Sequence, residues 1–188
     1  MGIGQIGVEH SHASGKMQAI RSLPGLWRIA GLADAKDRAR GPAYEGVPRL
    51  TEAQLLSDST VRAVAVETPL AQACATAMRA LRAGKHVHLD KPGATDHAEF
   101  AAMRGEAEQR GLILQMGYML RYNPGIVFLR RAVREGWLGE IMEVEGLMGK
   151  PAGETERDYA ANLPGGAMFE LGCHLIDVIV DLLGPPAA

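Results

Sequence analysis

The alternation of short apolar runs with helical patterns constrains the fold of this chain more than any other feature. Strand-like runs cover residues 3–8, 27–33, 61–66, 86–89 and 112–116. Helical patterns follow the first four of these runs, over residues 11–23, 51–57, 70–83 and 95–110. Repeated β-α units of this kind predict an α/β fold in which helices cover both faces of a parallel sheet.

The pattern changes near residue 120. The sequence predicts a helix over residues 123–135, a strand over 141–148 and a loop over 150–164. A longer and very apolar helix follows over residues 167–183, stopped by the run Gly-Pro-Pro at 184–186. We therefore expect a first domain over residues 1–120 and the beginning of a second, incomplete α/β domain over residues 121–188.

Composition excludes some classes of partner. The 188 residues carry a formal net charge of −2, without the basic stripe that is typical of nucleic-acid binding. No run is long and apolar enough to suggest a membrane span, and the chain opens in strand-like sequence rather than a signal peptide. Cys74 and Cys173 are far apart, which fits a reducing compartment. We expect a cytoplasmic protein with a small-molecule substrate and with neither nucleic-acid nor membrane partners.

Polar and turn-forming residues follow every predicted strand. In an open parallel sheet, ligands bind beyond the carboxyl ends of the strands, so these residues converge on one edge. The candidates for cofactor binding are Gly7, Glu9, His10, Ser11, His12, Asp34, Thr68, Pro69, Asp90, Lys91 and Pro92.

The sequence around the first strand can be aligned with the glycine motif G-x-G-x-x-G in two ways. A literal G-x-G-x-x-G covers residues 2–7, but it lies before and inside the predicted strand. A phosphate-binding turn must follow the strand, and in that frame it begins at Gly7 and places Glu9 and His12 at the second and third glycine positions. Glu9 then brings a side chain to the point where backbone approaches a pyrophosphate. We expect His10 or His12 to compensate by donating to phosphate at the helix N-terminus.

Asp34 ends the second predicted strand. A carboxylate there accepts hydrogen bonds from a ribose 2′-hydroxyl and repels a 2′-phosphate, so it favours NAD over NADP. Lys36 and Arg38 follow closely and soften that preference. The alternative is a solvated turn aspartate, or the N-cap of a short helix.

Lys91 lies at the mouth of the predicted nucleotide cleft, where Pro92 ends the strand. A lysine in this place stabilises negative charge that develops on a substrate oxygen. The alternative is a surface lysine in a turn.

The helix over residues 167–183 is apolar except for one stripe. Glu170, His174, Asp177 and Asp181 fall on that stripe at 100° per residue. Glu170 and His174 have i, i+4 spacing, so the carboxylate can orient the imidazole for proton transfer. The alternative is a structural Glu–His pair at a domain interface.

Three segments together resemble one protein family. "AGKHVHLDKPGA", "LQMGYMLRYNPG" and "PGGAMFELGCHLIDVIVDLLG" are similar to the glucose–fructose oxidoreductase/inositol dehydrogenase (Gfo/Idh/MocA) family. The resemblance implies an α/β fold, with a Rossmann doubly wound parallel sheet followed by the beginning of a second α/β domain. It also implies an NAD(P)-dependent oxidoreductase that transfers a hydride between the nicotinamide and a sugar, polyol or related carbinol.

The resemblance assigns roles to individual residues. Lys91 matches the catalytic lysine, in the sequence Asp90-Lys91-Pro92 where the family has Glu-Lys-Pro. His174 matches the acid/base histidine, with Glu170 in place of the family's aspartate. Thr68 and Pro69 match a loop that lines the cofactor, although Ala73 stands where many members have a histidine.

The match also covers the link to the second domain. In "RYNP" and the residues before it, Tyr118 and Arg121 are expected to face the substrate, together with Lys91, Glu170 and His174. The chain ends just after the first long helix of the second domain. We therefore expect a fragment or a site that a partner chain completes, and a homo-oligomer if the C-terminal sheet is completed.

Other functions stay open at this point. The first is a truncated or non-catalytic nucleotide-binding module of the same fold. The second is a metal site from the pairs His10/His12 and His86/His88. Strand alternation explains that spacing without a metal, so we expect no metal. The third is NAD-dependent cleavage of glycosides.

Overall fold

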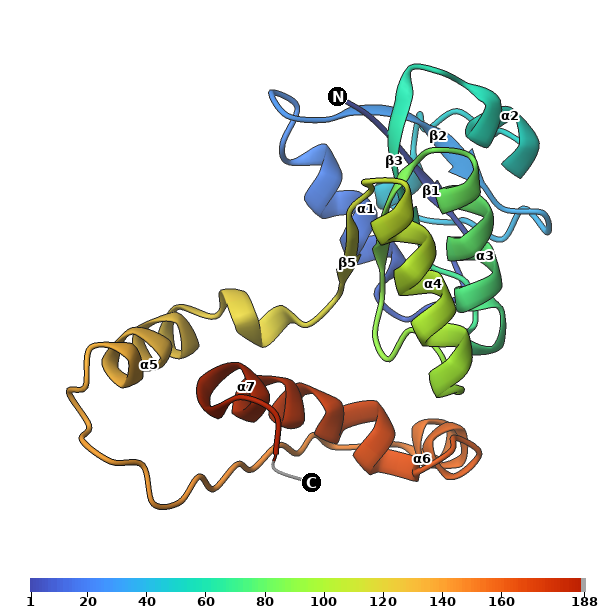
Figure 1. Ribbon diagram of the computed structural model, residues 1–188. Helices are drawn as coiled ribbons and strands as arrows, with labels where there is room; N and C mark the ends of the chain where they lie inside the picture. Colours follow the sequence, from blue (N-terminus) through green and yellow to red (C-terminus); the bar gives the residue numbers. More distant parts are fainter. Residues whose placement is uncertain (187–188) are drawn as a thin grey trace. The chain divides into compact units, whose positions relative to one another are not determined.

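The computed structural model describes residues 1–186, which form two compact units. The first unit is Met1–Gly117 and the second begins at Tyr118 (Figure 1). Each unit is described by itself below.

The first unit is built on a five-stranded sheet with the order β2-β1-β3-β4-β5. All neighbouring pairs are parallel, so the carboxyl ends of the strands meet at one edge. The strands are β1 (Gly2–Ile6), β2 (Arg28–Ala33), β3 (Val61–Val66), β4 (His86–Leu89) and β5 (Leu114–Met116). The predicted parallel sheet is confirmed, although its first strand ends at Ile6 instead of residue 8 and its last strand begins at Leu114 instead of residue 112.

Four helices join these strands, and their ends follow local capping chemistry. They are α1 (Ala13–Arg21), α2 (Glu52–Ser57), α3 (Leu70–Arg82) and α4 (His97–Gln109). The Thr51 side chain accepts the amide of Gln54 at the start of α2, and Asp96 accepts the amide of Glu99 at the start of α4. A short 3₁₀ helix, Pro42–Tyr44, lies between β2 and α2.

Both faces of the sheet are covered. Val64 and Val66 of β3 pack in the cluster that includes α3 and α4, which lie side by side in Figure 1. Ala63 and Ala65 point to the other face, where they pack with Ile20 of α1. Because successive strand residues alternate between the faces, an all-apolar strand is buried on both. This arrangement leaves the carboxyl edge of the sheet as the place where polar side chains gather.

The second unit is helical in the part of the chain that the structure describes. A 3₁₀ turn (Met119–Tyr122) precedes α5 (Pro124–Arg134) and α6 (Glu154–Ala161), and a π-helical turn (Met168–Gly172) runs into α7 (Cys173–Leu183). Two ion pairs hold its elements together. Arg121 binds Asp177 at 2.7 and 2.8 Å, and Arg130 binds Asp181. The polar stripe of the long helix is thus used in part for packing within this unit.

Two predictions for this unit are wrong. Residues 141–148 form no strand, because no other strand lies within the described residues 118–186 to accept their ladder hydrogen bonds. Residues 150–164 were expected to form a loop but contain α6. Glu154 and Glu156 in the first turn of α6 interact favourably with the helix dipole.

No helix within residues 1–186 is long and apolar enough to cross a bilayer.

Candidate functional site

The turn between β1 and α1 requires glycine at Gly7. Its φ is +84°, and a Cβ there would lie 2.8 Å from the carbonyl oxygen of Glu67. The Gly7 amide donates to the carbonyl of Ala33 at 2.8 Å, which ties the turn to the end of β2. The predicted turn at Gly7 therefore exists, and the glycine permits the close approach of β1 and β3.

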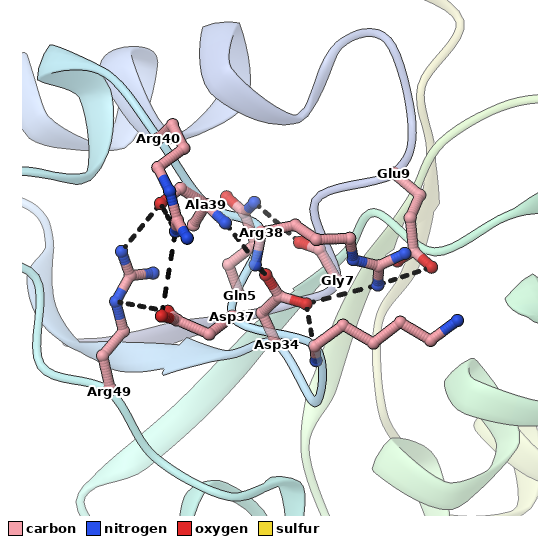
Figure 2. A network of polar contacts seen from close by, with 10 residues as sticks. Gln5, Gly7, Glu9, Asp34, Asp37, Arg38, Ala39, Arg40 and Arg49 are labelled. Carbon is pink, nitrogen blue, oxygen red and sulfur yellow. Dashed lines mark hydrogen bonds and ion pairs between the residues drawn. The ribbon is translucent and has the colours of Figure 1, made fainter.

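An ion-pair network lies beside this turn (Figure 2). The Arg38 guanidinium binds Glu9 at 2.7 Å and Asp34 at 3.2 Å, so it links the β1–α1 turn to the loop after β2. Glu9 occupies the second glycine position of the turn, and its carboxylate engages Arg38 in this structure. Arg38 therefore offsets much of the negative charge that Glu9 brings to the turn.

Asp34 is bound by its own loop. Its carboxylate accepts the amides of Lys36 at 3.3 Å, of Ala39 at 2.9 Å and of Arg38, and its side chain is only 1% exposed. Burial alone raises the pKa of Asp34, but these hydrogen bonds and the Arg38 side chain hold the pKa below its ordinary value. The Asp34 side chain is thus buried and bound by its own loop rather than solvated, and its predicted ribose contact stays a prediction.

A groove of about 430 Å³ opens along this edge. It borders the turn, the loop after β2 and the start of α3, with lining residues that include Gly7, Glu9, Asp34, Lys36, Arg38 and Thr68. The Thr68 hydroxyl is buried and has no hydrogen-bond partner among the described residues. A buried hydroxyl of this kind suits a polar ligand in the groove, and the site fits the adenosine end of a dinucleotide.

A smaller hollow of about 380 Å³ lies on the other side of the Glu9–Arg38 pair. Glu9 and Arg38 line both hollows, and the second also includes His10, Ser11 and Arg40. Ser11 precedes α1 and is exposed, so its side chain is accessible to a ligand.

Four side chains from three elements form a second polar cluster, here called the His–carboxylate cluster: His10, His12, Glu67 and Asp90. The Nδ1 of His12 lies 3.1 Å from Asp90, and the Nδ1 of His10 lies 3.7 Å from both Glu67 and Asp90. Glu67 ends β3 and Asp90 follows β4, so the sheet order brings them to the β1–α1 turn. The sequence analysis placed His10, His12 and Asp90 at this edge and assigned no role to Glu67.

The two carboxyl groups of this cluster differ in pKa. Burial, with a further contribution from the charge of Asp90, raises the pKa of Glu67 to about 7. Burial also raises the pKa of Asp90, but the hydrogen bond from His12 and the positive charges of His10, His12 and Lys16 lower it to about 2. Asp90 is thus the ionised member at neutral pH.

The second histidine pair is not part of this cluster. The Nε2 of His88 lies 3.1 Å from the ammonium of Lys16, and burial together with Lys16 lowers the pKa of His88 to about 4. His86 accepts the amide of Ile113 at 3.0 Å, a backbone contact near β5. The four-histidine arrangement that the spacing suggested is therefore not formed.

Lys91 follows β4 directly and is buried, with 3% of its surface exposed. Its amide donates to the Asp90 carboxylate at 2.8 Å, so the pair Asp90-Lys91 is fixed by the backbone. Pro69 immediately precedes α3 and Pro92 follows Lys91 directly, and both are half-buried. The surface-turn alternative for Lys91 is inconsistent with this burial.

In the second unit, His174 is buried at the start of α7. The Tyr118 ring meets it edge to face, with ring centroids 6.1 Å apart, and burial raises the pKa of the Tyr118 hydroxyl. Glu170 lies in the π-helical turn, where each turn holds an extra residue, and its predicted pairing with His174 stays a prediction. π-Helical turns of this kind are frequent at functional sites, and nothing in the hydrophobic pattern announced this one.

The predicted substrate residue Arg121 makes a two-pronged ion pair with Asp177. For Arg121 to bind a substrate, its guanidinium must either contact the substrate and Asp177 together or release Asp177.

A doubly wound parallel sheet with a glycine turn and a polar carboxyl edge defines the class of NAD-binding Rossmann proteins. Residues 1–118 match the oxidoreductase family with an NAD-binding Rossmann fold, and residues 126–188 match the GFO/IDH/MocA C-terminal domain. The chain therefore belongs to the Gfo/Idh/MocA oxidoreductase family.

Individual relatives agree with this assignment. A dTDP-3,4-didehydro-2,6-dideoxy-alpha-D-glucose 3-reductase from Actinomadura kijaniata is 33% identical over 74% of this chain and 41% of its own length. The uncharacterized oxidoreductase YhhX from Escherichia coli K12 is 31% identical over 85% of this chain and 47% of its own. A crystal structure of a probable oxidoreductase yhhX covers 99% of this chain and 55% of that chain, with a TM-score of 0.81 and 27% identity. The chain thus spans about half the length of the relatives it matches.

Proposed function

We propose that this chain carries the dinucleotide site and part of the substrate site of an NAD(P)-dependent oxidoreductase that acts on a carbinol group of a sugar, polyol or related compound. Membership of an oxidoreductase family with an NAD-binding Rossmann fold supports the reaction class. The sugar-nucleotide reductase among its relatives supports the substrate class.

The burial of Lys91 at the carboxyl edge of the sheet is the observation that carries this proposal. A buried ammonium needs a functional or structural reason, because burying a charge is costly. Lys91 follows β4 at the same carboxyl edge of the sheet as the groove, and there it can stabilise the alkoxide that forms when a carbinol is oxidised.

The other roles follow from chemistry and family membership. His174 accepts the hydroxyl proton, Glu170 tunes its basicity, and Tyr118 and Arg121 bind the substrate. When bound, the nicotinamide cofactor accepts or returns the hydride. The chain's own residues supply the proton acceptor, the compensating positive charge and the walls of the groove.

We propose NAD as the preferred cofactor, with NADP as the alternative. Asp34 and Glu9 place two carboxylates at the groove, and both bind the same Arg38. A 2′-phosphate would meet these carboxylates, while Lys36 and Arg38 supply the only opposing charge among the groove residues of this loop. The cytoplasm as location and a homo-oligomer as assembly belong to the same proposal.

A direct test begins with binding and continues with turnover. We expect NADH to bind the 188-residue chain, with Gly7→Val reducing that affinity because its side chain would collide with the backbone of Glu67. Turnover is then measured on a panel of sugars and polyols by the formation of reduced nicotinamide. Lys91→Ala and His174→Ala should each abolish turnover while NADH affinity changes little.

Two outcomes would contradict the proposal in different ways. Wild-type turnover in both variants would remove Lys91 and His174 from catalysis. Binding of NADH without turnover on any substrate, also in a longer form of the protein that includes the rest of the second domain, would favour the non-catalytic module. Glu9 at a glycine position is the observation on the side of that second candidate.

A further inference from the structure

The His–carboxylate cluster has the donor set and the geometry of a metal centre. It combines two imidazoles and two carboxylates from three elements that adjoin one another at the edge of the sheet. We propose that His10, His12, Asp90 and Glu67 bind one divalent transition-metal ion, with zinc as the best match. Imidazole and carboxylate ligands suit zinc in tetrahedral coordination.

The distances between the donor atoms fit one shared ion. Zinc ligands lie about 2.0–2.2 Å from the ion, which places tetrahedral ligand atoms about 3.3 Å from one another. The donor atoms of His10, His12 and Asp90 all lie within 4.8 Å of one another, and the His12–Asp90 separation is 3.1 Å. Glu67 lies 3.7 Å from the same His10 nitrogen that faces Asp90. His10, His12 and Asp90 thus form the core of the proposed site, and Glu67 adjoins it through His10.

The Nδ1 of His10 is the nitrogen that faces both Glu67 and Asp90. The backbone amide of His12 donates to this same nitrogen at 3.3 Å. Because an imidazole nitrogen has one lone pair, an ion bound at this nitrogen would displace that amide.

Glu67 supplies a second and independent observation. Its side chain is 0% exposed, and neither carboxylate oxygen has a hydrogen-bond partner among residues 1–186. Native proteins rarely leave a buried carboxylate without donors, and here a second carboxylate, Asp90, flanks the same histidine. A cation between the two carboxylates satisfies both, whereas hydrogen bonds within the protein do not reach Glu67.

The site also explains a departure from the glycine turn. His10 and His12 come from the turn after β1, while Glu67 and Asp90 come from the ends of β3 and β4. A bound ion would therefore join the turn to two neighbouring strands. His12, which stands at the third glycine position of the turn, would then act as a metal ligand together with His10.

The test uses zinc and cobalt ions alone and needs no dinucleotide or substrate, so its result is independent of the proposed function. The chelator-treated chain is titrated with Zn²⁺ by calorimetry, and with Co²⁺ while its visible absorption is recorded as a report of tetrahedral coordination. We expect one equivalent per chain and a higher melting temperature with the ion. His97→Gln, which changes an exposed histidine on α4, should bind like the wild type.

Substitution of the ligands should weaken binding. The double variant His10→Gln/His12→Gln should lose at least about 100-fold in affinity, and Asp90→Asn and Glu67→Gln about 10- to 100-fold each. Circular dichroism checks that every variant is folded.

Three results would overturn the proposal. One is the absence of saturable binding of one equivalent by the wild-type chain, which would mean that Glu67 holds a proton instead of sharing an ion. Another is wild-type affinity in the folded double variant. The third is loss of binding in His174→Gln instead, which would place the ion in the second unit.

Discussion

Two polar networks lie along the same edge of the sheet, and they are built in opposite ways. Asp34 is nearly inaccessible and accepts three backbone amides and a guanidinium. Glu67 is as deeply buried, yet its carboxylate oxygens accept no hydrogen bond within the described chain. The first network is complete as it stands, and the second contains a buried carboxyl group whose oxygens have no hydrogen-bond partner within the described chain.

The two carboxyl groups therefore contribute to different properties of the protein, one to folding stability and the other to ligand binding. The Asp34 carboxylate, whose oxygens accept several hydrogen bonds, stabilises the loop that borders the groove, so it contributes to the free energy of folding. An unsatisfied carboxylate costs folding free energy until a cation or a proton arrives, so its value is measured in ligand binding. Removal of the two groups should therefore change stability in opposite directions.

The largest expected effect is the loss of the complete network. Asp34→Asn should lower the free energy of unfolding by about 3 kcal/mol, because an amide cannot accept all the hydrogen bonds that the carboxylate accepts. Asp37→Asn is the matched control in the same loop. The Asp37 side chain is 74% exposed and makes only long ion pairs, so its change should cost less than about 0.5 kcal/mol. Urea denaturation measures the free energy of unfolding of both variants. Equal losses would contradict the stabilising role of the Asp34 hydrogen bonds.

Acid should reduce that difference. The pKa of Asp34 lies below its unfolded value, so its stabilisation is present above the unfolded pKa of about 3.9 and disappears as the pH falls through the folded pKa. Between neutral pH and the acid limit of the folded state, the gap between wild type and Asp34→Asn should therefore shrink. Unfolding curves recorded over this range would contradict the assignment if the gap stayed constant.

A third effect concerns the choice of cofactor. Arg38→Ala removes the cation that both Glu9 and Asp34 bind, so the groove becomes more negative. We expect NADP affinity to fall about tenfold relative to NAD affinity, which corresponds to about 1.4 kcal/mol. Arg40→Ala, which removes a mostly exposed side chain, serves as the control. A shift toward NADP in Arg38→Ala would show that the carboxylates do not set the preference.

The smallest effect has the opposite sign from the first. With a chelator present at pH 8, Glu67→Gln should raise the free energy of unfolding by about 1 kcal/mol, because a neutral amide replaces a buried carboxylate beside Asp90. Glu108→Gln, at an exposed ion pair, should change it by less than about 0.5 kcal/mol. Added zinc should stabilise the wild type more than Glu67→Gln. Destabilisation by Glu67→Gln under chelation would mean that this carboxylate has a partner of its own.

Much of the first unit could be predicted from the sequence. Short apolar runs bounded by turn residues identify strands, and the parallel sheet then places Gly7, Thr68 and Lys91 at one edge. The strand ends themselves depend on local geometry. The positive φ of Gly7 ends β1 after Ile6, and the amide of Leu112 closes the end of α4 before β5 begins.

What escaped prediction depends on contacts between distant segments. The partners of Glu67 follow from strand order, because β1 lies beside β3, and no spacing in the sequence encodes that neighbour. The π-helical turn that holds Glu170 shares its apolar pattern with an ordinary helix. Residues 141–148 have strand-like composition, but a strand exists only where another strand accepts its hydrogen bonds.

The position of β1 inside the sheet, between β2 and β3, has a kinetic consequence. Gly2 pairs with Arg28 on one side and with Val61 on the other, so β1 is an interior strand with a partner along each edge. Its partner β3 follows it in the chain only after about 60 residues. Pairing over such a separation is slow, and β1 keeps one edge open until β3 has been synthesised.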